Sequence, residues 1–454
     1  MAPATQMAAP PPRGGSFRVL RTARVAPSSP DGVPSLRQRA VPLTFLDAMW
    51  LPTPPVDRVF LYRLGAADDD VDAVLSRLAD SLSRVLHVFY PLAGRLRLTP
   101  GKTNRYELFY QPGDAVAFTV AEHDDGVGVD ELAADDPREV AKIAPLAPEL
   151  PDGGAVLAVQ ATVLPPARRG LALGVTVHHA ACDGSSSTHF LHTWAAACAG
   201  AVVLPKPPVI DRTFIRERED LYDIMVNRTK EESDKFSSPD VADNKLLATF
   251  TLSGEILQNI KDIVAAPSCH IHAALASDVE AENNPRNHGR AHFVFPTDHR
   301  ARMEPRVPDK YLGNCVGPCF ASAPKKEIAA ADAEDGLFTT CAAIAAAIDE
   351  GTRYDPGYWE RCREHVRGMS TSDGPPLAVA GSPRFRVYDV DFGFGRPTKV
   401  DVVSVAKTGA ISVAEGRGGG IEVGVGLPPE RMERFRRCFT DAVTWLSSPS
   451  SSDT

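Results

Sequence analysis

The chain has 454 residues, which is long enough for two ordinary domains and a large buried core. Hydrophobic residues make up 43% of the chain and charged residues 24%, which is typical of globular proteins and excludes a disordered or fibrous chain. The formal net charge of −9 excludes nucleic-acid binding driven by overall charge, so a site for a polyanion has to be a local basic patch.

The start of the chain and its cysteines predict a protein of a reducing compartment. Residues 1–15 are rich in Pro and Ala and lack the apolar core of a signal peptide, so we expect a disordered lead and a cytoplasmic protein. No apolar run is long enough to cross a bilayer, and we expect no membrane partner. The eight cysteines contain no CxxC pair, which argues against a metal site and favours reduced thiols.

The first half alternates predicted strands and helices. Apolar residues recur at three- and four-residue steps from Val71 to Leu86, which predicts a helix, and a second helix begins after Gly184. Residues 89–96 form a predicted buried loop. Strands are predicted at 56–64, near 105–111 and 115–120, and at 155–164 and 171–177.

A change of composition then marks a linker. Three prolines between 205 and 208 precede the charged stretches 216–220 and 230–235. The second half mixes strands and helices again and closes with a hairpin, 410–415 and 421–427, joined by a glycine-rich turn, and with a helix that starts at Pro428. The predicted fold is a mixed α/β fold organised as a lead at 1–15, a domain at 16–205, a crossover linker at 206–235, a second domain at 236–446 and a disordered tail at 447–454.

The first candidate site is the sequence HHAACDG at 178–184, where an apolar strand ends and a helix begins. Taken alone, the pattern HxxxD is weak, because a strand-end histidine followed by an Asp-Gly turn can simply cap the next helix. Acyl transfer to an alcohol, however, needs a base whose pKa is near the working pH, and imidazole suits that role. His179 can project into a cleft from this position, and Asp183 can order the loop without touching substrate.

The second candidate is the sequence DFGFGRP at 391–397. A kinase is excluded, because no glycine-rich phosphate loop precedes it and no His-Arg-Asp loop is present. The glycine-rich stretch 416–420 lacks the Lys-Ser/Thr ending of a phosphate-binding loop, and the absence of GxSxG argues against a serine hydrolase of that type.

Together these two motifs resemble the plant BAHD acyltransferase family, which has HxxxD near one third of the chain and DFGWG near the end. The resemblance covers nearly the whole chain. Further stretches agree with it in order: PLTFLDAMWL (42–51), YPLAGRL (90–96), DGSSSTHFLHTWA (183–195), DHRARMEP (298–305), YLGNC (311–315) and VAGSPRFRVYDVDFGFG (379–395).

The resemblance implies two domains of the chloramphenicol-acetyltransferase type joined by a crossover segment, with a solvent channel between them. It implies that His179 is the catalytic base and that Asp183 pairs with an arginine away from the channel. Arg302 is the first candidate for that partner and Arg300 the second. Acyl-CoA is then a co-substrate, no permanent cofactor or metal is needed, and the enzyme is expected to be a monomer.

Further residues receive roles from the same resemblance. Asp391 with Gly393 and Gly395 belongs to a structural turn, and Gly381 and Ser382 match the stretch that the family places beside the CoA arm.

Two points bear on catalysis and on CoA binding. Asn314 is a candidate to stabilise the oxyanion. Residues 270–290 depart from the family, because acidic side chains stand where its members are apolar, which puts local packing and a contact to a CoA phosphate in doubt.

The blocks at 42–51 and 311–315 resemble the branch that acylates anthocyanins, flavonoids and phenolic glycosides. The expected reaction transfers a malonyl group from malonyl-CoA to a sugar hydroxyl of such a glycoside. Two alternatives remain: the same fold with an aromatic hydroxycinnamoyl-CoA donor, and a binding-only relative without turnover. A malonyl carboxylate requires a cation at the acyl end of the site, for which the sequence offers four arginines: Arg300, Arg302, Arg384 and Arg386.

Overall fold

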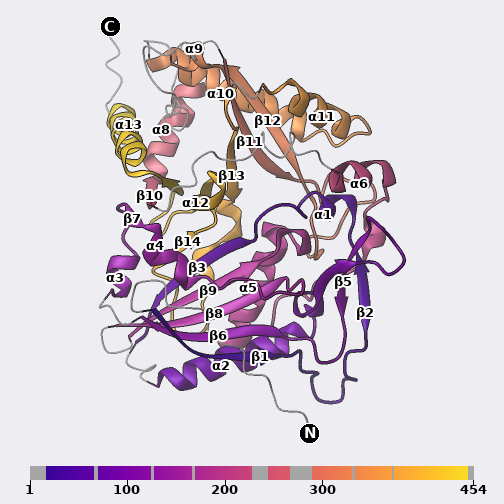
Figure 1. The fold of residues 1–454 in the computed structure, drawn as a ribbon. Coiled ribbons are helices and arrows are strands. Elements are labelled where there is room, and N and C mark those ends of the chain that lie inside the picture. The colour runs from indigo at the N-terminus through magenta and orange to yellow at the C-terminus, as the bar shows by residue number, and fades with distance from the viewer. Residues whose placement is uncertain are drawn as a thin grey trace.

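The computed structural model describes residues 17–65, 70–123, 127–165, 169–227, 244–265, 289–329, 333–370 and 373–447. Nearly all of the predicted lead and tail, and residues 270–288 of the unusual stretch, lie outside the described residues. The described chain is a mixed α/β fold with sheets of six, seven and three strands (Figure 1).

The six-stranded sheet is built mainly from the first half of the chain and is covered on both faces. Phe60 and Tyr62 point to one face with helices α2 and α5, while Val59 and Leu61 point to the other. Every residue of the two adjacent strands that precede the HHAACDG sequence is buried, as expected for a sheet that is covered twice. The strands in sheet order are β1 (Phe17–Val25), β6 (Val116–His123), β8 (Leu157–Leu164), β9 (Gly170–Val177), β3 (Val56–Arg63) and β14 (Lys399–Val402).

Two long helices pack together on this sheet. The side chain of Asp70 caps α2 (Val71–Leu86), whose predicted apolar stripe is buried. Helix α5 (Gly184–Cys198) crosses it, and the indole nitrogen of Trp194 donates to the carbonyl oxygen of Leu78 at 3.1 Å. These contacts fix the position of α5, whose first residue, Gly184, ends the HHAACDG sequence.

The seven-stranded sheet forms the upper part of the view in Figure 1. Helices α8 (Gly254–Ala265) and α13 (Pro429–Ser447) pack together beside it, with Phe435 of α13 against Phe250 of the sheet, and α10 (Ala333–Gly351) and α11 (Tyr358–Gly368) lie along its edge strand β12. Its strands in order are β12 (Val316–Pro324), β11 (Arg290–Asp298), β13 (Leu377–Gly381), β15 (Ile411–Glu415), β16 (Ile421–Leu427), β10 (Leu246–Leu252) and β7 (Arg138–Glu139).

The remaining elements are short. The three-stranded sheet consists of β2 (Arg39–Pro42), β5 (Tyr106–Tyr110) and β4 (Arg95–Leu98). The short helices are α1 (Phe45–Ala48), α3 (Val129–Leu132), α4 (Val140–Ile143), α6 (Glu219–Val226), α9 (Lys325–Ile328) and α12 (Val405–Thr408). Helix α6 starts inside the charged stretch that the sequence placed in the linker and packs on α1, because Leu221 and Tyr222 are buried. The domain limits themselves stay a prediction.

The two halves of the chain exchange strands. Strand β14 comes from the second half but pairs with β3 in the six-stranded sheet, and β7 comes from the first half but pairs with β10 in the seven-stranded sheet (Figure 1). Arg138 of β7 holds Asp401 of β14 with two hydrogen bonds of 2.8 and 3.0 Å, and both side chains are buried. A buried bidentate ion pair therefore joins the two exchanged strands.

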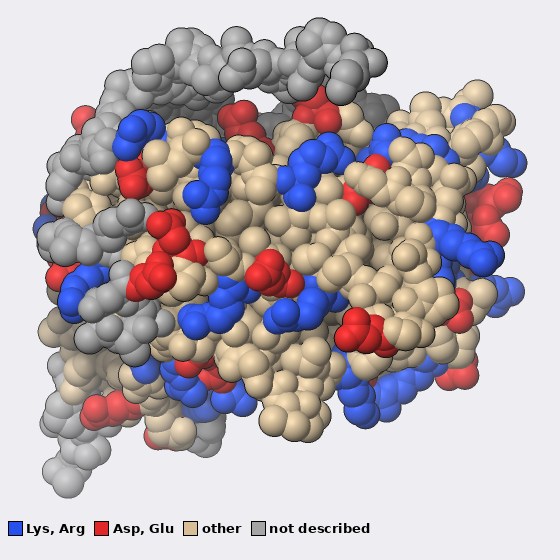
Figure 2. Space-filling model, turned by 90° about the horizontal axis from the view of Figure 1, so that it is seen from below, with Lys and Arg blue, Asp and Glu red and all other residues tan. Residues whose placement is uncertain are grey.

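The surface carries charges of both signs. On the face shown in Figure 2, basic and acidic side chains alternate instead of forming a continuous basic field. Within the described ranges, no helix is long and apolar enough to cross a membrane.

The exchanged strands give a stability prediction. Replacing Arg138 with Met should lower the free energy of unfolding by about 3–5 kcal/mol, because Asp401 is left buried and unpaired. Urea denaturation measures the change. Arg306→Met is the matched control, since Arg306 and its partner Asp309 are both exposed and should contribute below about 1 kcal/mol. Equal losses in the two variants would contradict the prediction.

Candidate active site

His179 lies at the end of a buried strand and just before a helix. Strand β9 ends at Val177, residues His179–Ala181 form a short 3-10 turn, and the side chain of Asp183 caps α5 by accepting from the backbone N–H of Ser186 at 2.9 Å. His178 turns back on the chain, where its Nδ1 accepts from the N–H of Ala180. The two neighbouring histidines therefore have different surroundings.

The imidazole of His179 is held by a polar pair from two distant segments. Asn314 Oδ1 lies 3.2 Å from His179 Nδ1, and Asn314 Nδ2 donates to the carbonyl oxygen of His179 at 2.9 Å. The buried carboxylate of Asp47 in turn accepts from both the backbone N–H and the Nδ2 of Asn314, at 2.8 and 3.0 Å. The sequence assigned no role to Asp47, although it lies in the block at 42–51.

These partners fix the tautomer of His179. The Asp47 carboxylate and the backbone carbonyl can only accept, so both face the amide nitrogen of Asn314, and its Oδ1 faces the ring. Because that oxygen can also only accept, Nδ1 of His179 carries the proton. The other ring nitrogen, Nε2, then has a free lone pair, which is the requirement for a general base.

Trp50 completes the support of the ring. Its indole stacks on the imidazole of His179, with ring centroids 3.8 Å apart and planes inclined by 14°. Burial lowers the pKa of His179 to about 4, although the nearby Asp183 acts in the opposite direction. The imidazole is therefore neutral at physiological pH, so the lone pair of its unprotonated nitrogen is available.

Asp183 points away from the ring into a buried ion pair. Its carboxylate lies 2.8 Å from Arg300 Nη2 and accepts from the backbone N–H of Cys315 at 3.0 Å. The sequence-based choice of Arg302 as the first partner is wrong, and the second candidate, Arg300, takes that place. Arg302 is exposed and donates to the carbonyl oxygen of Asp298, because the turn that starts at His299 directs the two arginines to opposite sides.

The same contacts correct two predicted substrate-binding residues. Arg300 is buried and engaged by Asp183 and Asp298, so it is not available for CoA. Both hydrogens of the Asn314 amide are used within the protein, so they hold the His179 segment and leave no amide N–H for an oxyanion.

The DFGFG turn and its approach lie beyond this network. Asp391 Oδ1 accepts from the N–H groups of Gly393 and Gly395 at 2.7 and 3.0 Å, and both glycines have positive φ angles of 92° and 102°. Gly381 ends β13 with a φ of 86°, and a Cβ there would lie 2.5 Å from the carbonyl oxygen of Val413. Ser382 follows, and its hydroxyl accepts from the N–H of Arg384. Contact of Gly381 and Ser382 with CoA stays a prediction.

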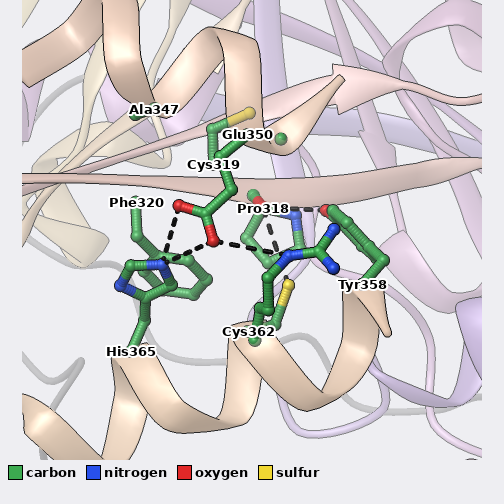
Figure 3. Close-up of a pocket in the computed structure, with 10 residues that line it drawn as sticks. Pro318, Cys319, Phe320, Ala347, Glu350, Tyr358, Cys362 and His365 are labelled. Carbon is green, nitrogen blue, oxygen red and sulfur yellow. Dashed lines mark hydrogen bonds and ion pairs between the residues drawn. The ribbon is translucent and has the colours of Figure 1, made fainter. Parts of the chain in front are cut away.

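A separate small hollow lies between β12, α10 and α11 (Figure 3). Glu350 contacts His365 at 3.2 Å and Arg361 at 3.4 Å, so its charge is matched there. Burial raises the pKa of Cys319 to about 11 and that of Cys362 to about 12, which keeps both thiols protonated. None of the residues that line this hollow belongs to the network around His179.

A strand-end histidine whose tautomer is fixed by hydrogen bonds, and whose ring is neutral, has the features that a general base needs. The family model described as "Transferase family" matches residues 17–264 and 269–442. The chain belongs to this family of BAHD acyltransferases and is an acyltransferase enzyme of that type.

The sequence similarity to named relatives extends over nearly their whole length. The chain is 31% identical to phenolic glucoside malonyltransferase 1 of Arabidopsis thaliana, with 92% of this chain and 96% of the relative covered. It is 28% identical to coumaroyl-CoA:anthocyanidin 3-O-glucoside-6''-O-coumaroyltransferase 1 of the same plant, with the same coverage. Vinorine synthase shares the fold with a TM-score of 0.66 and 20% identity, covering 92% of this chain and 96% of that one.

The Asp183–Arg300 pair predicts energetic coupling. In a double-mutant cycle, Asp183→Asn and Arg300→Gln should show a coupling energy well above about 0.5 kcal/mol in the free energy of unfolding, because the two charges touch in a buried site. Arg302→Gln, paired with Asp183→Asn, is the control and should be additive. Additivity with Arg300 would show that the pair contributes nothing specific.

The lowered pKa of His179 predicts how kcat/KM changes at acid pH. An unperturbed histidine titrates near about 6.5, whereas His179 resists protonation down to about pH 4. kcat/KM should therefore stay nearly level as pH falls through about 6.5 and decline only well below it. Far-UV circular dichroism at each pH checks that the fold persists. A decline centred at pH 6.5 or above would contradict the assignment.

Proposed function

We propose that this enzyme transfers a malonyl group from malonyl-CoA to a sugar hydroxyl of a phenolic, flavonoid or anthocyanin glycoside. The observation that carries the acyl-transfer chemistry is the proton held on His179 Nδ1 by Asn314, which leaves Nε2 as the base. Three of the named relatives at 31% identity are malonyltransferases, of phenolic glucosides or of an anthocyanidin 5-O-glucoside, which supports the donor and the acceptor class.

The reaction proceeds in one transfer. Acyl-CoA and acceptor meet at His179, which we expect them to reach through a channel between the two halves. His179 Nε2 takes the proton of the sugar hydroxyl while its oxygen attacks the thioester carbonyl carbon. The tetrahedral intermediate then expels the CoA thiolate, which receives that proton from the imidazolium, so the products are an ester and free CoA. General-base catalysis contributes about 10²–10⁴-fold, and positioning of both reactants adds more.

An acyl-enzyme on the neighbouring cysteine is disfavoured. Cys182 is buried three residues after His179, and burial raises the pKa of its thiol well above the usual range. The thiolate that a nucleophile needs is therefore not formed at neutral pH. Direct attack by the acceptor remains as the chemical route.

A second candidate uses an aromatic donor. The relatives include coumaroyltransferases at 28% and 27% identity, close to the values for the malonyltransferases. A binding-only protein is disfavoured, because the Asp47–Asn314–His179 network is complete. We also propose a cytoplasmic location, since the seven described cysteines are free thiols, as in a reducing compartment. The monomeric state stays a proposal that rests on the family resemblance.

The test is a donor comparison with one glycoside acceptor. kcat/KM is measured for malonyl-, acetyl- and coumaroyl-CoA by release of free thiol. Malonyl-CoA should exceed acetyl-CoA by more than about fivefold, roughly 1 kcal/mol, if the site recognises a carboxylate. Coumaroyl-CoA as the best donor would establish the second candidate instead.

Two variants test whether His179 is the base. His179→Ala should lower kcat by about 10²-fold or more for every donor with the fold intact. His178→Ala is the matched control and should retain most activity, because His178 accepts a hydrogen bond from the backbone of its own turn. Near-full activity in His179→Ala would exclude His179 as the base.

A further inference from the structure

Arg58 is a buried cation that has no charged partner among the residues that the structure describes. It lies on β3 and is 8% exposed, and its Nη1 donates to the hydroxyl of Thr188 at 3.3 Å. No carboxylate of the described residues lies within ion-pair distance of its guanidinium. A largely buried guanidinium with so few partners is stabilised when an anion pairs with it.

Three other buried cations each have a carboxylate partner. Arg138 pairs with Asp401, Arg300 with Asp183, and Lys399 with Asp135. Asp57, the neighbour of Arg58 on β3, cannot serve as its partner. Adjacent strand residues point to opposite faces, and the Asp57 carboxylate pairs with Lys407 at 2.7 Å.

The guanidinium of Arg58 lies at the start of helix α5, next to the catalytic motif. Thr188 is on the first turns of that helix, and a Cβ placed on Gly184 would lie 3.8 Å from Arg58 Nη2. The positive charge is also near enough to His179 to add, after the larger effect of burial, to the lowering of the pKa of the imidazole. The N-terminal end of α5 contributes further positive potential to the same place.

The chemistry of the donor indicates which anion fits here. During transfer the thioester carbonyl has to lie at His179, and a malonyl carboxylate is separated from that carbonyl by a single methylene. The phosphates of CoA lie at the far end of its long pantetheine arm. An anion that reaches the neighbourhood of both His179 and Arg58 is therefore expected at the acyl end.

We propose that Arg58 binds the free carboxylate of a dicarboxylic acyl donor such as malonyl-CoA, with Thr188 orienting its guanidinium. The inference rests on the proposed donor and names the residue that recognises it. A planar guanidinium offers a carboxylate two parallel hydrogen bonds, and in a buried site this gives both affinity and selectivity. An aromatic acyl group would leave the same cation unpaired.

The experiment compares malonyl-CoA and acetyl-CoA in variants of Arg58. Arg58→Met should lower the ratio of kcat/KM for malonyl-CoA over acetyl-CoA by about tenfold or more, with acetyl-CoA changed by less than about threefold. Arg58→Lys keeps the charge and loses the paired hydrogen bonds, so its ratio should lie between those of Arg58→Met and the wild type. Arg63→Met, at the exposed end of the same strand, should leave the ratio unchanged.

Each of the other possible results would reject either the role of Arg58 or the proposed donor. Equal losses for both donors together with a raised inhibition constant for free CoA would assign Arg58 to a CoA phosphate. A wild-type preference for malonyl-CoA that survives in Arg58→Met would reject the role of Arg58 alone. A wild type that prefers coumaroyl-CoA would reject the proposed donor and this inference with it. Thermal melting monitors folding, and if Arg58→Met does not fold, an unchanged ratio in Arg58→Lys rejects the inference.

Discussion

The geometry of the site depends on the contacts of one buried carboxylate, that of Asp183. It caps α5 through Ser186, receives the backbone N–H of Cys315, and holds Arg300 from the loop after β11. Three segments from both halves of the chain thus converge on one buried charge. Because Asn314 immediately precedes Cys315, the same contact places the Asn314 amide against His179. Asp183 therefore acts on the base by positioning it.

The exchange of strands explains how two halves can support one site rigidly. Strand β14 extends the first sheet and β7 extends the second, so separating the halves would break both sheets. The Arg138–Asp401 pair lies where the exchanged strands meet, and Lys399 of β14 reaches Asp135 of the first half. A buried pair such as Arg138–Asp401 strongly penalises the loss of one partner, which favours a single arrangement.

Burial shifts the pKa values of two groups near the site in opposite directions, and both groups stay uncharged at neutral pH. It keeps His179 neutral, so the base is available, and it keeps Cys182 protonated, so a competing nucleophile is suppressed. Asp183 keeps its charge matched by Arg300, while Arg58 has no such match among the described residues. The electrostatic balance near His179 thus leaves one positive charge for a substrate anion.

The sequence by itself determined the local elements and singled out His179 as the candidate base. Helix α2, strands β3 and β9 and the hairpin of β15 and β16 follow their predicted ranges closely, because hydrophobic period and turn residues act over short distances. The placement of His179 between a strand end and a helix start could be predicted because strand, turn and helix are consecutive in the sequence. Only the tertiary structure decided the rest. Arg300 and Arg302 are two positions apart, and the turn at His299 selects which one is buried. Asp47, Trp50 and Arg58 reach the site from more than a hundred positions away, and no local pattern encodes contacts of that range.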